Sequence, residues 1–307
     1  MRGLFPWLIQ FFTLYLPLAN FVIIPPTAFT HPNLCTFLVL SAVLTVKSRV
    51  KSSYIHRIAS NALTPHNSLI NPFELIGDIR SINKEDYRRS IIMVAPHGPT
   101  FYPVVYLGAL FEREFDIPYT GMTTPALFKI PYAPMLMTVL CNIVGVDPVS
   151  LTEFLKGDNG PGVTYPGGFD DVFDNSSDNT VLTVNVTPSS LLFRAAADYG
   201  RNLIPTLVIN ETEIYTHSKL VVDTFKYVHK NYTRTGIPVP PVSPCGLPLL
   251  GSTKKMLILY GKPVKGNDCE ELALNYIDAL KELHQNAVKQ GITNKPMNVK
   301  IRGSAKL

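Results

Sequence analysis

The chain has 307 residues, a formal net charge of +5 and only 17% charged residues, against about a quarter in typical globular domains. This length suits one sizeable α/β domain with an appendage, and it is enough to bury a real core. The basic residues are scattered and form no Lys- or Arg-rich helix face, which argues against nucleic-acid binding and favours a membrane surface or an anionic cofactor. The four cysteines show neither CxxC pairs nor metal-ligand spacing, as expected of reduced thiols in a cytosol-facing protein.

The N-terminal segment predicts a membrane anchor. Residues 3–46 contain no Lys, Arg, Asp or Glu, and residues 4–24 form an apolar run of the length that a bilayer core requires. Pro25-Pro26 ends this run, and residues 27–46 provide a second one. Basic residues flank the pair on both sides, so a hairpin with both ends in the cytosol satisfies the positive-inside rule. The alternatives are a cleaved signal peptide, which the length of the run disfavours, and one long tilted span with a lumenal catalytic domain.

The hairpin sets the domain organisation that we expect. Residues 1–46 are the membrane hairpin, residues 47–89 a basic connector, residues 90–291 the α/β domain and residues 292–307 a basic C-terminal tail. The functional motifs all fall within the α/β domain.

The first motif surrounds His97. Residues 90–95 form a short apolar run that predicts a buried strand ending at Pro96. Pro99 suits the first turn of a following helix, whose apolar spacing continues to Phe111. His97 is therefore expected where the carboxyl end of a strand meets a helix N-terminus, a place where ligands bind in open α/β sheets. The positive helix end favours a neutral imidazole that can accept a proton; the alternative is a surface histidine at an ordinary turn.

A strand at 143–146 and a helix at 151–156 precede the second motif, in the glycine-rich stretch 160–172. There a brief strand leads into Gly167-Gly168, and two carboxylates follow at Asp170-Asp171. Paired glycines allow positive φ angles and a close approach of the backbone to a ligand. They also expose N–H groups that can stabilise an oxyanion. The alternative is a plain turn with solvated aspartates.

The rest of the α/β domain alternates strands and helices. Strands are expected at 181–186, half-exposed, and at 203–209 and 256–260; helices are expected from Thr187-Pro188 to Gly200, and from an Asp268/Glu271 capping box to Gly291. This alternation predicts an α/β fold with a mixed sheet flanked by helices. The chain has no GxSxG elbow, no P-loop and no GxGxxG after a strand, which argues against an α/β hydrolase, an NTPase and a dinucleotide enzyme.

Five features occur in one order along the chain. They are the hairpin, Pro96-His97-Gly98 at a strand end, Tyr165-Pro166-Gly167-Gly168 followed by acids, Glu211-x-Glu213-x-Tyr215, and Gly261-Lys262-Pro263-Val264 before the last helix. Together they resemble the type-2 diacylglycerol acyltransferase family, which includes monoacylglycerol and wax-alcohol acyltransferases. The resemblance extends over roughly residues 75–290, and it implies an acyltransferase-like sandwich and makes residues 90–291 an acyltransferase domain.

Residue by residue, Pro96-His97-Gly98 is similar to the last three positions of the family's His-Pro-His-Gly, which makes His97 the catalytic histidine. Gly167-Gly168 and Asp171 resemble its Gly-Gly-x-x-Glu, with Asp in place of Glu. An imidazole that acts as a base needs a carboxylate to orient it, and Asp171 is the first choice for that role. Backbone N–H groups near Gly98 and Gly167-Gly168 are the candidates for the oxyanion site.

The third motif, Glu211, Glu213 and Tyr215, matches the family's Glu-Asn-Glu-x-Tyr. Either glutamate is the second choice for the carboxylate beside the histidine, and Tyr215 is expected to contact substrate. The sequence departs from the family at two places. Ala95 stands where the family has its first histidine, and Ser189-Ser190 stand where it carries basic residues.

The resemblance implies a membrane-bound O-acyltransferase. It would move a fatty acyl group from acyl-CoA, a co-substrate and not a permanently bound cofactor, to the hydroxyl of diacylglycerol or a similar neutral lipid alcohol, with no metal. The implied location is the endoplasmic reticulum membrane with a cytosolic catalytic domain, or the lipid droplet. The ending Ala305-Lys306-Leu307 resembles a peroxisomal address. The alternative function is a non-catalytic membrane or lipid-droplet protein that retains the fold, and the two departures motivate it.

Overall fold

A computed structural model gives the fold of residues 73–77, 79–98, 102–125, 142–157, 159–177, 179–214, 219–228, 231 and 255–303. The predicted membrane hairpin at 1–46 lies outside the described residues. Among those that are described, no helix combines the length and the apolar character needed to cross a bilayer.

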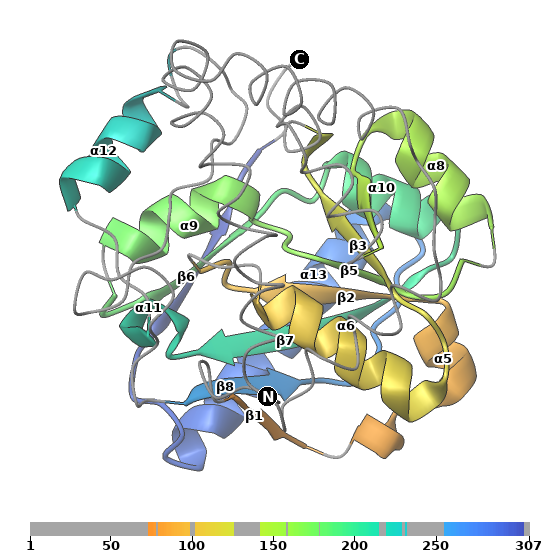
Figure 1. Ribbon diagram of the computed structural model, residues 1–307, viewed down its shortest axis with the longest axis horizontal. Helices are drawn as coiled ribbons and strands as arrows, with labels where there is room; N and C mark the ends of the chain where they lie inside the picture. Colours follow the sequence, from red (N-terminus) through yellow and green to blue (C-terminus); the bar gives the residue numbers. More distant parts are fainter. Residues whose placement is uncertain are drawn as a thin grey trace, which may run out of the picture.

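A seven-stranded sheet with the order β1-β8-β7-β2-β5-β3-β4 forms the centre of the described part of the chain (Figure 1). Its strands are β1 (Phe73–Ile76), β2 (Ser90–Ala95), β3 (Thr120–Thr123), β4 (Ile143–Gly145), β5 (Gly162–Thr164), β7 (Asn202–Ile209) and β8 (Met256–Tyr260). The run from β7 to β4 is parallel, whereas β8 pairs antiparallel with β7 and parallel with β1. A second, two-stranded parallel sheet joins β6 (Leu182–Val186) to β9 (Met297–Ile301). The predicted α/β fold with a mixed sheet is confirmed.

Helices cover both faces of the main sheet. One face carries η2 (Ile79–Ser81), α5 (Lys84–Arg88) and α6 (Tyr102–Phe115). The opposite face carries α8 (Pro148–Lys156), α10 (Leu191–Asp198) and α13 (Cys269–Lys289), which lies behind the sheet in Figure 1. The remaining described helices are α9 (Gly168–Ser177), packed on β6 and on α12 (Lys219–Val228), and the short α11 (Glu211–Ile214).

The central strand β2 is buried on both of its faces. Ile92 and Val94 point to the α6 side, while Ile91, Met93 and Ala95 point to the α13 side, and all five are fully buried. Side chains of a strand alternate between faces, so a strand covered by helices on both sides is apolar at every position. This is why the stretch at 90–95 is uniformly apolar, and it makes β2 a rigid support for the residues that follow it.

The folded unit extends beyond both expected domain boundaries. Strand β1 comes from the stretch predicted as a connector, and it forms one edge of the main sheet beside β8. Strand β9 comes from the stretch predicted as a basic tail, and its pairing with β6 buries every residue of β6. The expectation that 181–186 is half-exposed is therefore wrong.

The helix predicted to begin at Thr187-Pro188 begins later. Ser190 is the N-cap of α10, and its hydroxyl accepts a hydrogen bond from the Phe193 N–H. Asp268 caps α13 as predicted, through hydrogen bonds from the N–H groups of Glu270 and Glu271.

Helix α13 offers a matched test of core packing. Leu280 is fully buried against the sheet, whereas Leu274 on the same helix is 51% exposed. We expect Leu280→Ala to lower the free energy of unfolding by about 2–5 kcal/mol, because it removes packed methyl groups and leaves a cavity. Leu274→Ala should change it by no more than about 0.5 kcal/mol. Urea titrations of the two variants measure the difference, and equal losses would contradict the position of α13.

Candidate active site

Three neighbouring parallel strands end at one edge of the main sheet, and each is followed by a side chain of the candidate site. Tyr165 follows β5, His97 lies two residues after β2, and Glu211 lies two residues after β7. Since β2 lies between β5 and β7, His97 occupies the middle of this edge. The carboxyl ends of parallel strands are where open α/β sheets bind ligands.

The imidazole of His97 lies among aromatic rings. It stacks on Tyr165 with the ring centroids 3.7 Å apart and the planes 11° from parallel. The ring of Phe169, on α9, lies 6.5 Å away at a tilt. His97 is only 6% exposed. His97 therefore lies at the carboxyl end of β2, as predicted. The alternative of a surface histidine is wrong, because the side chain is buried.

Burial sets the protonation state of His97. Loss of hydration lowers the pKa of the imidazole from 6.5 to about 3, and a hydrogen bond with the Gly98 backbone offsets only part of this effect. The ring is therefore neutral near pH 7. The sequence predicted a neutral imidazole because of a helix end, whereas burial accounts for it in the structure.

The carboxyl group of Glu211 lies against the turn that carries His97. A Cβ atom on Gly98 would overlap this carboxyl group, so only glycine leaves room for it. The residue before Glu211, Asn210, adopts a left-handed conformation with φ 71°, which asparagine tolerates better than most residues. Glu211 is 4% exposed.

Tyr165 links the histidine to the glutamate. Burial raises the pKa of the Tyr165 phenol well above its usual value, and the charge of Glu211 raises it further. The same hydroxyl forms a hydrogen bond with the backbone of Val104, in the first turn of α6. The Tyr165 ring is thus held at both ends, by the sheet and by a helix.

Asp171 contacts the backbone of His97. The Oδ2 atom of Asp171 accepts a hydrogen bond of 3.2 Å from the main-chain N–H of His97. Its Oδ1 atom accepts hydrogen bonds from the backbone and the side-chain amide of Asn185, at 2.6 and 2.9 Å. Asp171 therefore holds the turn that carries the imidazole, in place of the predicted role of orienting the ring itself. A Cβ atom on Gly167 would overlap the Asp171 carboxylate, which explains the need for glycine there.

A chain of hydrogen bonds connects Asp171 to the C-terminal strand. The side-chain oxygen of Asn185, on β6, accepts a hydrogen bond of 2.9 Å from Nε of Arg302, which follows β9. Arg302 also forms an ion pair of 2.6 Å with Asp170. A series of four groups thus runs from Arg302 through Asn185 and Asp171 to the backbone of His97.

The other predicted site residues lie at different places. Glu213 forms an ion pair with Lys295, with 2.7 Å between Oε1 and Nζ. Tyr215 lies outside the described residues. Gly167 lies in the turn before α9, and Gly168 begins α9 with a positive φ of 52°. In the described ranges, no three His, Cys, Asp or Glu side chains come together as a metal-ligand group.

Ala95, where the resembled family has a histidine, is fully buried in the apolar layer between the sheet and α13. Its side chain points to the opposite face from Val94. An alanine fits this layer, and a histidine there would bring a polar ring into an apolar environment, where burial without a partner is costly.

Three residues of the site were not predicted from the sequence. Tyr165 stands in the quoted Tyr-Pro-Gly-Gly motif, and its place directly after a brief strand is the signal that could have found it. Asn185 and Arg302 carry no such local signal, because pairing between distant strands brings them to Asp171.

No protein-family model and no curated protein matches the sequence. Among solved structures, the crystal structure of the 1-acyl-sn-glycerophosphate (LPA) acyltransferase PlsC from Thermotoga maritima is similar to this chain, with 13% identity and a TM-score of 0.42. The match covers 93% of this chain and 98% of that one.

We expect His97 and Asp171 to have opposite effects on the free energy of unfolding between about pH 4 and 6.5. His97 has a pKa of about 3 in the folded chain, below its ordinary 6.5, so its contribution to stability is present above 6.5 and is lost as the pH falls. Asp171 has a pKa raised from 3.8 to about 7, mainly by burial, so its contribution is present below 3.8 and is lost as the pH rises through 7.

Because the two pH dependences oppose each other, replacing one residue should leave the pH dependence of the other visible. In His97→Gln, the free energy of unfolding should fall more steeply with rising pH than in the wild type, whereas in Asp171→Asn it should rise more steeply. Urea titrations of both variants and the wild type at several pH values between 4 and 7 measure these slopes. Parallel curves for all three proteins would show that neither group is buried as described.

Proposed function

We propose that this chain is an acyl-CoA-dependent O-acyltransferase of the type-2 diacylglycerol acyltransferase kind. The observation that carries the proposal is a neutral, buried imidazole at the carboxyl end of the central strand, stacked on Tyr165 and beside the turn that Glu211 contacts. Acyl transfer from a thioester needs a base for the acceptor hydroxyl and no covalent intermediate, because the thioester is already activated.

In the proposed reaction, His97 takes the proton of the acceptor hydroxyl as its oxygen attacks the thioester carbonyl. The new C–O bond forms, the C–S bond breaks, and the imidazolium returns the proton to the leaving thiolate of coenzyme A. The products are the ester and free coenzyme A. Backbone N–H groups at Gly98 and Gly167-Gly168 are the proposed donors to the oxyanion.

Glu211 is the proposed partner of the imidazolium. An imidazole with a pKa of about 3 holds a proton poorly, so the transition state requires a negative charge beside the ring. The Glu211 carboxyl group lies against Gly98, the residue next to His97, and its charge acts on Tyr165, which stacks on the same imidazole. Asp171 is assigned a positioning role, because its carboxylate accepts from the His97 backbone.

The acceptor is proposed to be diacylglycerol or a similar neutral lipid alcohol. Monoacylglycerol, long-chain alcohols and sterols present the same hydroxyl, and Tyr215 is a proposed substrate contact. The uncharged segment at residues 3–46 supports a place at a membrane, with the endoplasmic reticulum or the lipid droplet proposed before the peroxisome.

One observation favours a second candidate, a membrane or lipid-droplet protein that keeps the fold without the chemistry. Asp171, which matches the acid of the family's glycine motif, contacts the backbone of His97. A protein of this kind would bind acyl-CoA weakly and turn none over, so a transfer assay separates the two candidates.

We expect His97→Ala to lower the rate of acyl transfer by about 10²- to 10⁴-fold, the usual contribution of a general base. The rate is measured in membranes from a host without neutral-lipid synthesis, supplied with acyl-CoA and each acceptor in turn, and the products are identified by mass. Membrane insertion of the variant serves as the control for folding. Equal rates for the variant and the wild type would contradict the assignment of His97 as the base. If the wild type forms no product with any acceptor, the non-catalytic candidate is favoured.

The two glutamates provide a matched comparison in the same assay. Glu211→Gln should lower the transfer rate far more than Glu213→Gln, because the structure directs Glu211 to the His97 turn and Glu213 to Lys295. The reverse order would move the acid partner to Glu213.

A further inference from the structure

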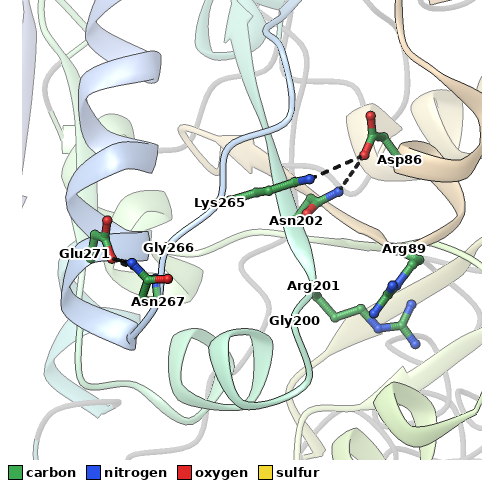
Figure 2. A pocket seen from close by; sticks show the side chains of 9 residues that line it. All are labelled: Asp86, Arg89, Gly200, Arg201, Asn202, Lys265, Gly266, Asn267 and Glu271. Atoms are coloured by element: carbon green, nitrogen blue, oxygen red, sulfur yellow. Dashed lines mark hydrogen bonds and ion pairs between the residues drawn. The ribbon is translucent and has the colours of Figure 1, made fainter.

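A second candidate site lies at the opposite edge of the main sheet from His97. A pocket of about 360 Å³ lies at the amino ends of β2 and β7, where Arg89 and Arg201 directly precede the two strands (Figure 2). Lys265 reaches the same edge from the loop after β8, because β8 runs antiparallel to β7. The six residues of β2 span about 20 Å, so the pocket is separate from the histidine site.

Arg201 supplies a fixed positive charge. The residue is 6% exposed, and its Nη2 atom donates hydrogen bonds of 2.9 Å to the carbonyl oxygens of Leu155 and Gly157, at the end of α8. Its guanidinium also lies over the ring of Phe154, 5.7 Å from the centroid. A charge held in this way loses little conformational entropy when a ligand binds, and a partly buried charge acts more strongly than a solvated one.

Arg89 and Lys265 supply two adjustable charges. Both are exposed, and the structure gives the Arg89 guanidinium no hydrogen bond or ion pair with the described residues. The Nζ atom of Lys265 lies 3.9 Å from Oδ1 of Asp86, an exposed pair that contributes little stability. Either side chain can therefore turn toward a ligand at small cost.

The acids of the pocket leave an excess of positive charge. Three cations and two carboxylates, Asp86 and Glu271, line it, which gives a net charge of +1. Asp86 also accepts a hydrogen bond from the side chain of Asn202. Glu271 accepts two hydrogen bonds from Asn267, at 2.7 and 2.9 Å, so its charge is directed to the loop that precedes α13.

We propose that this pocket binds a phosphomonoester group. Such a group carries a charge of about −1.5 to −2 near pH 7 and three strong acceptor oxygens. Arginine forks match these oxygens in pairs, and lysine adds a point charge. A monocarboxylate has one charge and two oxygens, and it leaves the third cation unused. The site is independent of the chemistry at His97.

Titration calorimetry of the full chain in detergent with inorganic phosphate tests the proposal. We expect saturable binding that is stronger than binding of acetate. Arg89→Gln/Lys265→Gln should weaken it about a hundredfold, at about tenfold for each lost charge-assisted contact. Arg80→Gln/Lys281→Gln removes the same two charges from exposed ion pairs elsewhere, and it should keep the wild-type affinity. Arg201 is left unchanged because it also holds the end of α8.

Two further arms identify the source of the phosphate. Glucose 6-phosphate compared with glucose tests a free phosphorylated molecule, and vesicles with phosphatidic acid compared with phosphatidylcholine vesicles test a lipid headgroup. Binding in either arm that the double pocket variant loses supports the proposal. His97→Ala should bind phosphate as the wild type does. The proposal is overturned if phosphate binds no better than acetate, or if the pocket variant, with an unchanged melting temperature, binds as tightly as its control.

Discussion

The hydrogen bonds of one buried carboxylate organise the candidate active site. Asp171 is fully buried, and it accepts hydrogen bonds from the His97 backbone and from two nitrogens of Asn185. These contacts join the end of β2 to the helix α9 and the strand β6, which follow it by more than 70 residues in the chain. A buried carboxylate is tolerated only when its oxygens are satisfied, so the positions of all three segments depend on one another.

Burial gives His97 its fixed position, but the same burial weakens it as a base. The aromatic rings that hold the imidazole also remove its water, which lowers its pKa to about 3. A catalyst near neutral pH works best with a pKa close to the operating pH. In the proposed reaction, the carboxyl group of Glu211, for which Gly98 leaves room, would raise the basicity of the imidazole. Gly98 and Gly167 are thus explained by the two acids that occupy the space a Cβ atom would fill, and Gly168 by its positive φ.

The sequence identifies the parts of the site that follow strand ends. His97 and Glu211 stand directly after apolar runs, and the edge they share is a consequence of parallel pairing, which the alternation of elements predicts. The role of Asp171 could not be predicted, because it lies on a helix and its partner is a backbone N–H. Strand β9 was also missed: its alternation is short, and the charges of Lys300 and Arg302, which pair with acids of α9, are typical of a solvated tail when read alone.

The dependence of the site on β9 has a consequence for how the protein is made. Among the described strands β9 is the last in chain order, so on the ribosome it is the last of them to emerge. Until it does, β6 lacks its partner and Asn185 lacks the hydrogen bond from Arg302. The main sheet can assemble earlier, since all of its described strands precede α13. A nascent chain would therefore carry His97 on a formed main sheet before the turn around His97 is fixed. The candidate site would be complete only once β9 and Arg302 have left the ribosome and reached β6.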